Sequence, residues 1–229
     1  MVKKLQIKVS SSKDIEDLKK FTISKQPFTL KFDIIRNSKG VLMPKKLILL
    51  IGAPGAGKST DSKIIAEKHS ESITSYSTGD LIKEEVKNGT AIGKIAKSFV
   101  DKGDLVPTGI VVDIIVNAIN SAPTSVVLLD GFPGKEKQLQ YFCDYIFNND
   151  KIKLVSVLEI KVNNALAKER FLASGRSEEI FEHEMKSYKE SLSEIEAHYE
   201  DKHVLKVIDG ERDIDVVIAE IDSFLQSKI

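Results

Sequence analysis

One stretch of the chain combines glycines, a lysine and a serine in a spacing that suits phosphate binding. Residues 52–59, Gly-Ala-Pro-Gly-Ala-Gly-Lys-Ser, fit the pattern G-x-x-x-x-G-K-[ST]. Glycine lacks a Cβ atom, so the backbone of such a loop can turn sharply and direct its N–H groups at phosphate oxygens. Lys58 would then reach the β- and γ-phosphates of a nucleotide, and the Ser59 hydroxyl would ligate Mg²⁺. The motif predicts a site for a nucleoside triphosphate.

The residues on either side of this loop are those that such a site requires. Residues 47–51, just before it, are short and wholly apolar, as in a buried parallel strand. Residues 62–68, just after it, have the pattern of a helix, whose N-terminus adds partial positive charge at the loop. The alternative is a glycine-rich turn that fits the pattern by chance, and the flanking strand and helix disfavour it.

From residue 45 onward, strands and helices alternate, which is typical of an α/β protein with a parallel sheet. The predicted strands are 46–51, 73–76, 125–130, 153–160 and 204–208. The predicted helices are 58–69, 79–88, 91–102, 109–121, 135–147, 162–172, 179–200 and 213–227. The helix over 179–200 carries an apolar stripe that indicates either a core-facing side or a coiled-coil seam. It spans under three heptads, and this length favours the core-facing interpretation.

Residues 1–44 have a different pattern and predict a small β-α-β appendage whose function is not visible in the sequence. Leu5, Ile7 and Val9 alternate with polar residues, and the alternation returns over residues 28–34. Pro44 marks the junction to the rest of the chain. If this segment binds anything, we expect a protein partner.

Composition narrows the classes of ligand. Lys and Arg total 34, as do Asp and Glu, so an extended basic surface for nucleic acid is disfavoured. No apolar run reaches the length of about 18 residues that a membrane span needs, and residues 1–8 do not form a secretory signal. The single Cys143 excludes an internal disulfide and a thiolate zinc site. We therefore expect a cytoplasmic protein that binds small molecules, without nucleic acid or membrane. We also expect a monomer, although composition itself does not settle the oligomeric state.

Three further segments carry chemistry. They are Ser-Thr-Gly-Asp-Leu-Ile over 77–82, Gly-Asp-Leu-Val-Pro over 103–107 and Val-Val-Leu-Leu-Asp-Gly-Phe-Pro over 126–133. The last ends a buried strand in an acid, which can hold a metal-bound water beside a phosphate loop. In this order and spacing, the segments closely resemble the adenylate kinase family of P-loop nucleoside monophosphate kinases. The resemblance runs from about residue 46 to the C-terminus and is most specific over 52–133 and 208–212.

The resemblance implies a doubly wound five-stranded parallel sheet, a small helical clamp for the nucleoside monophosphate near 75–106 and a very short lid near 172–179. It also implies the reaction of ATP and AMP to give two ADP, with Mg²⁺ as cofactor. The lid lacks the cysteines of zinc-bearing members, so no structural metal is expected.

The same resemblance implies a role for individual residues. The catalytic residues would be Lys58, Asp130 and Arg176. The ATP-binding residues would be Gly52, Ala53, Pro54, Gly55, Ala56, Gly57, Lys58, Ser59, Thr60 and Arg170. The AMP-binding residues would be Thr78, Gly79, Lys83, Gly131 and Gln138, of which Thr78 and Gln138 favour adenine. Mg²⁺ would be held by Ser59, Asp80 and Asp130, mainly through water.

Simpler interpretations exist for several of these residues. Thr78 and Asp80 would also serve as caps of the helix at 79–88. Gln138 would also fit an ordinary exposed helix position, and Arg170 a surface charge. Each of these alternatives needs only local structure, so the sequence leaves them open.

The chain departs from the family pattern at four positions where arginine is expected. These positions hold Lys83, Gly134, Ser174 and Glu184. Phosphoryl transfer depends on positioned charge, and lysine cannot reproduce the bidentate fork of arginine. Two interpretations follow: an adenylate kinase with a reduced rate, and a non-catalytic adenine-nucleotide-binding relative that acts in sensing or assembly. A P-loop ATPase coupled to transport or nucleic acid is a third class with little support.

Overall fold

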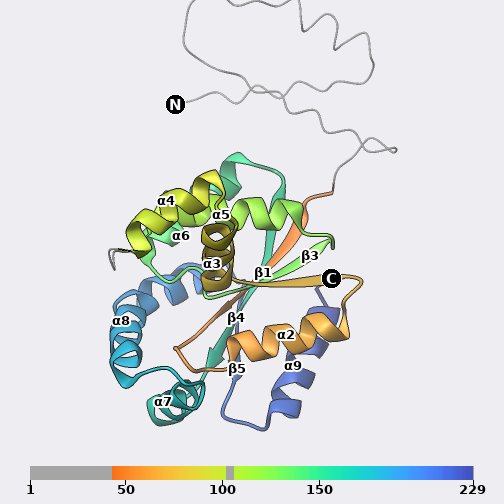
Figure 1. Ribbon diagram of the computed structural model, residues 1–229. Helices are drawn as coiled ribbons and strands as arrows, with labels where there is room; N and C mark the ends of the chain where they lie inside the picture. Colours follow the sequence, from red (N-terminus) through yellow and green to blue (C-terminus); the bar gives the residue numbers. More distant parts are fainter. Residues whose placement is uncertain (1–42, 102–105, 229) are drawn as a thin grey trace, which may run out of the picture. The chain divides into compact units, whose positions relative to one another are not determined.

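The computed structural model describes residues 43–101 and 106–228, so the predicted appendage over 1–44 lies almost wholly outside the described residues. Within the described part, the strands form one parallel sheet in the order β2-β3-β1-β4-β5 (Figure 1). The strands are β1 (Lys45–Ile51), β2 (Ile73–Ser77), β3 (Val126–Asp130), β4 (Ile152–Lys161) and β5 (Leu205–Asp209). The expected five-stranded α/β fold is confirmed.

Helices cover both faces of this sheet, because alternate residues of the central strand point to opposite sides. Leu47 and Leu49 of β1 pack in one apolar cluster, and Ile48 and Leu50 pack in the other. The first face is covered by α3 (Thr78–Asn88), α4 (Ala91–Val100), α5 (Thr108–Ser121) and α6 (Glu136–Asn148). The second face is covered by α2 (Lys58–Lys68), α7 (Asn164–Ala173) and α9 (Ile214–Gln226), with α2 and α9 side by side in Figure 1.

The long helix α8 (Glu178–Asp201) belongs to both layers. Phe181 and Met185, near its start, pack in the cluster of α2, α7 and α9, whereas Ile195 and Tyr199, near its end, pack in the cluster of α3 to α6. The apolar stripe of this helix therefore faces the core, as the sequence favours, and not a coiled-coil partner.

The predicted bounds agree with the structure to within two residues at every described end. The predicted start of α7 is corrected by two residues, because the sequence predicts a helix from 162 and the helix begins at Asn164. Asn163 caps it instead, since its Oδ1 atom accepts a hydrogen bond from the Leu166 N–H at 2.9 Å. The end of α4 is a second correction, at Val100 instead of 102. None of the helices in the described residues is long and apolar enough to cross a membrane.

The sheet order brings the motif-bearing loops together. β1 lies at the centre between β3 and β4, and the phosphate loop leaves its carboxyl end. Asp130 ends β3 in register with Leu50 of β1 and with Ser77 of β2. In parallel sheets, ligands bind at the carboxyl ends of strands. The loop, the acid of β3 and the start of α3 therefore meet at one edge.

Candidate functional site

The phosphate loop is packed so closely that two of its positions accept only glycine. A Cβ atom at Gly55 would lie 2.0 Å from the carbonyl oxygen of Ala167, and one at Gly52 would lie 2.4 Å from that of Ile160. Both residues also have positive φ values, of 83° and 142°. The backbone of β4 and α7 thus supports the loop from behind, which fixes the direction of its N–H groups.

Lys58 folds back over the loop. Its Nζ atom donates hydrogen bonds to the carbonyl oxygens of Gly52 at 2.9 Å and Ala53 at 2.8 Å. Burial lowers the pKa of this ammonium, while the nearby carboxylates of Asp130 and Glu184 oppose the shift. The cation is therefore held at the loop, with carbonyl dipoles as its partners before any phosphate binds.

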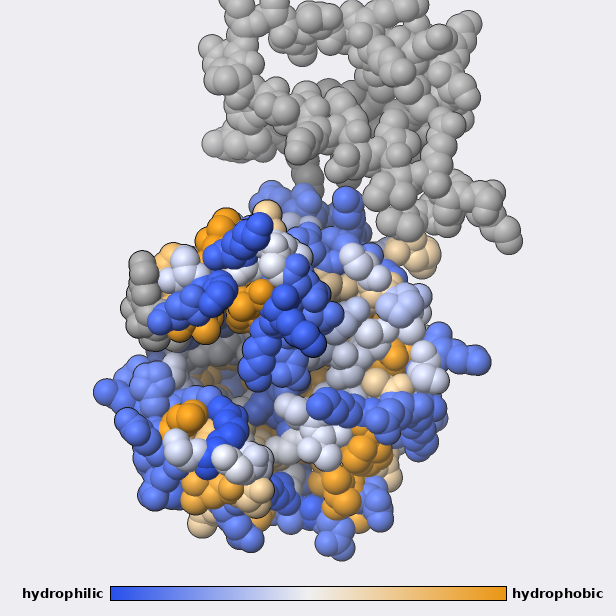
Figure 2. All heavy atoms as spheres, viewed as in Figure 1, coloured by the Kyte–Doolittle hydropathy of each residue, from blue (hydrophilic) through white to orange (hydrophobic). Residues whose placement is uncertain are grey.

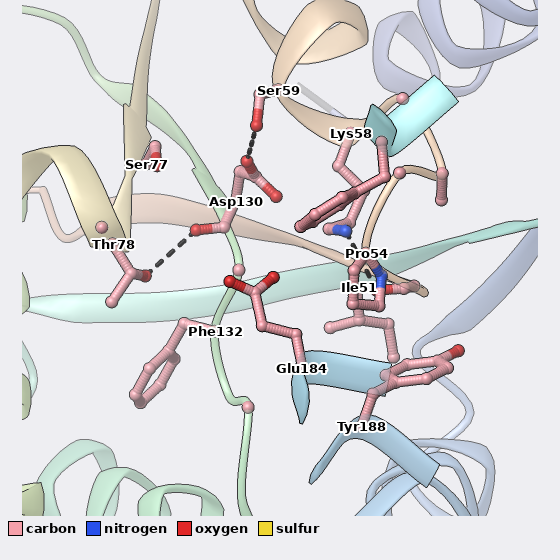
Figure 3. A pocket seen from close by; sticks show the side chains of 18 of the residues that line it. Ile51, Pro54, Lys58, Ser59, Ser77, Thr78, Asp130, Phe132, Glu184 and Tyr188 are labelled. Carbon is pink, nitrogen blue, oxygen red and sulfur yellow. Dashed lines mark hydrogen bonds between the residues drawn. The ribbon is translucent and has the colours of Figure 1, made fainter. Parts of the chain in front are cut away.

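Ser59 and Asp130 form the part of the site that fits a hard cation. The Ser59 hydroxyl donates a short hydrogen bond to Asp130 Oδ2, drawn in Figure 3. Asp130 is only 4% exposed, and its Oδ1 atom is buried without a hydrogen-bond partner. An unpartnered buried carboxylate oxygen is costly unless a ligand completes it. A serine oxygen and a carboxylate also match the oxygen ligands that Mg²⁺ prefers, alongside water.

The residues expected to bind the monophosphate lie on the neighbouring side of the site. The Thr78 hydroxyl donates to the carbonyl oxygen of Asp130 at 3.0 Å, so it does not cap α3 as the alternative interpretation requires. Gln138 is half-buried, and its Oε1 atom accepts from the Gly134 N–H at 2.8 Å. Asp80 is exposed and lies 3.4 Å from the ammonium of Lys83. Gln138 is therefore tied to the loop after β3, and Asp80 is paired with Lys83.

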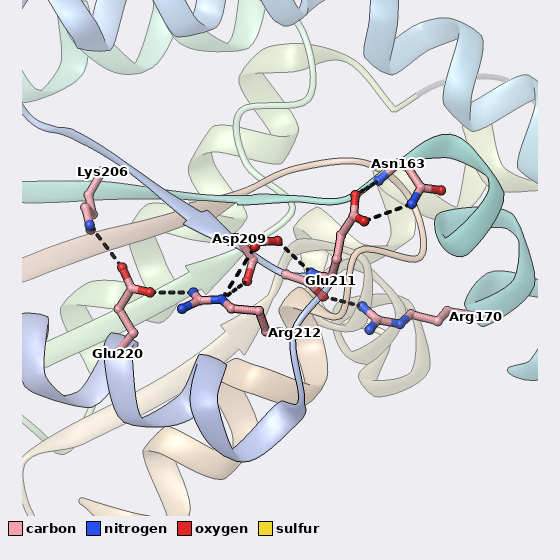
Figure 4. Close-up of polar contacts among 8 residues, drawn as sticks. Asn163, Arg170, Lys206, Asp209, Glu211, Arg212 and Glu220 are labelled. Carbon is pink, nitrogen blue, oxygen red and sulfur yellow. Dashed lines mark hydrogen bonds and ion pairs between the residues drawn. The ribbon is translucent and has the colours of Figure 1, made fainter.

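Arg170 marks the opposite end of the site (Figure 4). Its Nη1 atom donates to the carbonyl oxygen of Gly210 at 2.9 Å, so the side chain is fixed to the loop after β5 and is not a free surface charge. That loop is itself held in place, since Glu211 accepts hydrogen bonds from the backbone and side chain of Asn163, and Arg212 pairs with Glu220. A planar guanidinium fixed in this way suits stacking on a nucleotide base.

The segment expected to form the short lid, near 172–179, includes the loop of residues 174–177 that connects α7 to α8. Arg176 lies in it, with its guanidinium 3.9 Å from the centre of the Phe171 ring and in a short ion pair with Glu184 of α8. Figure 3 shows the Glu184 carboxylate pointing into the site between Asp130 and Lys58. The lid arginine is thus paired with a carboxylate of this chain.

Nearly all the residues expected at the site line one cleft with a volume of about 1160 Å³. In Figure 2 it is a hollow between the surface over α3 and α4 and the surface over α7 and α8. Sites for one small molecule usually measure roughly 300–1,000 Å³, so this cleft is larger than a usual single-ligand site. Of the residues expected at the site, Ala53 alone does not line the cleft, and its role is confined to the backbone of the loop.

Comparison with known proteins decides the family. The adenylate kinase family model matches residues 50–204. An adenylate kinase of a Sulfurovum species is 45% identical over 196 residues, which cover 81% of this chain and 100% of the relative. The chain belongs to the adenylate kinase family. It is therefore a phosphotransferase, as the sequence predicts.

Two further relatives agree with this assignment to the adenylate kinase family. An adenylate kinase of a Nitratiruptor species is 48% identical over 189 residues, which cover 81% of this chain and 97% of the relative. An adenylate kinase of Helicobacter hepaticus is 43% identical over 189 residues, which cover 81% of this chain and 100% of the relative. The similarity thus extends over nearly the whole length of each relative.

The four positions at which the sequence analysis expects an arginine all lie at the cleft. Lys83, Gly134, Ser174 and Glu184 each line the cleft. A Cβ atom at Gly134 would meet only the Gln138 side chain at 3.6 Å and a carbonyl oxygen at 4.0 Å, so a larger side chain has room there. These four residues therefore contribute to the charge and shape of the cleft and do not belong to the buried core.

Sequence reasoning missed other residues that line the adenylate kinase cleft: Asp61, Lys135, Tyr188 and Arg212. Burial raises the pKa of Asp61 to about 6, although the Arg170 guanidinium acts against this shift. The spacing of the phosphate loop gives no signal for Asp61, which lies one turn further along α2. The segment 208–212 was part of the resemblance, and Arg212 could have been found there.

Proposed function

We propose that this protein transfers the γ-phosphoryl group of ATP to AMP, giving two ADP, at a rate below that of relatives with the full set of arginines. One observation carries the proposal: a single cleft is lined by Arg170, by the phosphate loop with Lys58, and by Thr78 and Gln138. Two nucleotides bound in this way would bring their phosphates together near Lys58, which removes most of the entropic cost of their encounter.

In this proposal, ATP and AMP are bound by different residues of the cleft. Arg170 stacks on the ATP base, and the loop with Lys58 holds the β- and γ-phosphates. Thr78 and Gln138 bind the adenine of AMP, with Gly79, Lys83 and Gly131 beside it. Arg176 stabilises charge on the transferred group once it leaves Glu184.

Mg²⁺ would be held by the Ser59 hydroxyl and, through water, by Asp130. The ion would neutralise charge on the phosphates. Asp80 would take part only after release from Lys83, so we expect its contribution to be the smaller one.

The reduced rate follows from the charges at the site. Catalysis of phosphoryl transfer rests almost entirely on positioning and charge stabilisation. Glu184 adds a carboxylate where the transferred group would carry developing negative charge, and Gly134 offers no charge at all. Binding depends more on the loop and on Thr78 and Gln138, which keep the residue types that the resemblance implies for nucleotide binding. A non-catalytic nucleotide-binding protein remains the second candidate, favoured by the Arg176–Glu184 ion pair.

A coupled assay of ADP formation from ATP and AMP, run beside calorimetric titration of each nucleotide, tests the proposal. We expect binding of both nucleotides, measurable ADP formation and dependence on Mg²⁺. Binding of both without turnover would favour the second candidate, and absence of AMP binding would overturn the proposal.

A further inference from the structure

Lys135 lines the cleft at a position where the stability of the following helix would favour another type of residue. It precedes the first residue of α6, Glu136, in the N-cap position, where serine, threonine, aspartate or asparagine would accept a hydrogen bond from the helix. Lysine has no acceptor atom, and no side-chain cap is formed. A cation at this end of a helix also opposes the helix dipole. Local stability therefore disfavours a lysine here.

Its ammonium also lacks a partner, unlike the other cations of the cleft. Lys58 bonds to loop carbonyls, Lys83 lies against Asp80, and Arg170, Arg176 and Arg212 each have a bonded partner. Within the residues that the structure describes, Lys135 is the one lysine or arginine lining the cleft whose charged group makes no hydrogen bond or ion pair. Its side chain is nevertheless half-buried. An ammonium that lines a cleft without a protein partner is available to an anion that binds there.

The position of Lys135 in the fold indicates which phosphate of a bound nucleotide its ammonium would contact. The loop that carries it leaves β3 after Asp130, and α3 with Lys83 leaves β2 after Ser77, which is in register with Asp130. The Gly134 N–H is bonded to Gln138, so the backbone just before Lys135 is fixed against the residue expected to bind adenine. Lys83 and Lys135 thus flank the acceptor side of the cleft from neighbouring strands.

We propose that Lys135, with Lys83 as the second cation, binds the phosphate of the acceptor nucleotide. This assignment rests on the proposed function, because it places the monophosphate beside Thr78 and Gln138. The charge that the family pattern provides as arginine at position 134 is provided here one residue later, by an ammonium. An ammonium binds phosphate as a point charge and not as a planar fork.

The test compares Lys135→Met with a matched control, Lys137→Met. Lys137 lies on the same helix, is exposed and does not line the cleft. Both changes remove one positive charge from the start of α6, so they share any effect on the helix dipole. AMP, adenosine and ATP are titrated against the full chain by calorimetry, and the KM for AMP is measured in the ADP assay. Melting temperatures verify that each variant folds.

We expect Lys135→Met to weaken AMP binding and raise its KM by about tenfold, as for loss of a charge-assisted hydrogen bond. Adenosine and ATP affinities should change by less than about twofold, since neither places a phosphate against Lys135. Lys135→Arg should keep AMP affinity within about threefold of the parent. If Lys135 had only a structural role, Lys135→Met would weaken adenosine binding as much as AMP binding.

Equal AMP affinity in Lys135→Met and Lys137→Met would overturn the assignment while leaving the proposed function intact. Equal losses of AMP and adenosine affinity in Lys135→Met would overturn it as well. A parent that binds ATP but neither AMP nor adenosine would instead overturn the proposed function, and the assignment with it.

Discussion

Arg176 and Glu184 form an ion pair across the lid, and the same guanidinium lies 3.9 Å from the centre of the Phe171 ring. The side chains of Arg176 and Glu184 are 45% and 38% exposed, so the pair is accessible to water and to a bound nucleotide. An ion pair this exposed contributes little to stability, about 0–1 kcal/mol. Its main consequence is for the cleft, where it neutralises Arg176 and places a carboxylate among the residues expected to bind phosphate.

Replacement of this carboxylate should increase the rate. Glu184→Gln keeps the shape of the side chain, frees Arg176 and removes repulsion of the transferred group, and we expect kcat to rise by about three- to tenfold. The double variant Gly134→Arg with Glu184→Arg should raise the rate by at least about tenfold, with a smaller change in ATP affinity. The effects of the two substitutions should be coupled, because both act on one transferring group.

Glu182→Gln is the matched control, since Glu182 lies on the same helix, pairs with Lys168 and does not line the cleft. Single-turnover and steady-state rates of ADP formation are measured for all variants. A double variant that folds, binds both nucleotides and is no faster than the parent would show that these positions do not limit the reaction.

Lys58→Ala should remove most of the nucleotide-dependent stabilisation. ATP with Mg²⁺ at about a hundred times its Kd should stabilise the parent by about 2.7 kcal/mol, seen as a rise in melting temperature. Each variant is compared with its own nucleotide-free form, because Lys58 also bonds to loop carbonyls in the free protein. Lys63→Ala, on an exposed position of α2, should keep the full rise. A parent whose melting temperature does not respond to millimolar ATP and Mg²⁺ would refute the triphosphate site.

Gln138→Ala should reduce the preference for AMP over CMP. The amide of Gln138 lies at the acceptor side, and its loss leaves base groups unpaired and releases the Gly134 N–H. We expect AMP affinity to fall by about fivefold or more and CMP affinity to change less. Gln140→Ala is the control, because Gln140 bonds only to the exposed Glu136 on the outer side of α6. Equal binding of AMP and CMP by the parent would already contradict the prediction.

Stability should fall as pH rises from about 4.5 to about 7, and Glu159→Gln should reduce this slope. Burial raises the pKa of Glu159 to about 7, with a hydrogen bond to Glu196 as the next cause. In that pH range the unfolded chain releases the proton that the folded protein keeps, so the folded state is most favoured at the acidic end. Glutamine imitates the protonated form and should stabilise the protein at pH 7.5 by about 2 kcal/mol.

Melting temperatures from pH 5 to 8 provide the measurement, with Glu194→Gln on the exposed side of α8 as the control. Some slope should remain in Glu159→Gln, because Asp61, with its pKa raised to about 6, acts in the same direction. A lower melting temperature for Glu159→Gln than for the parent at pH 7.5 would contradict the assigned protonation state.

The fold was predictable because its signals are local. The apolar run before Gly52 and the alternation of strands with helices fix β1, the loop and the layer order, and the acid at the end of β3 fixes Asp130. Helix α7 begins two residues later than the sequence predicts, because Asn163 caps it. Hydrophobic periodicity cannot detect such a cap.

The charge arrangement of the site was not predictable in the same way. The Arg176–Glu184 pair and the contact of Arg170 with Gly210 depend on how α7, α8 and the loop after β5 meet in space. Lys135 lies outside every motif, and only the absence of a partner among the described residues draws attention to it. Motifs identify residues that bind a ligand directly, whereas the partners of each charge follow from tertiary packing.

The packing of α8 in both layers has a consequence for how the protein unfolds. Phe181 and Met185 anchor one end of this helix in the layer of α2, α7 and α9, and Ile195 and Tyr199 anchor the other end in the layer of α3 to α6. Neither layer can open fully without uncovering part of α8. Residues 43–228 should therefore unfold in one cooperative transition, with the central amides of α8 exchanging with solvent only through global unfolding.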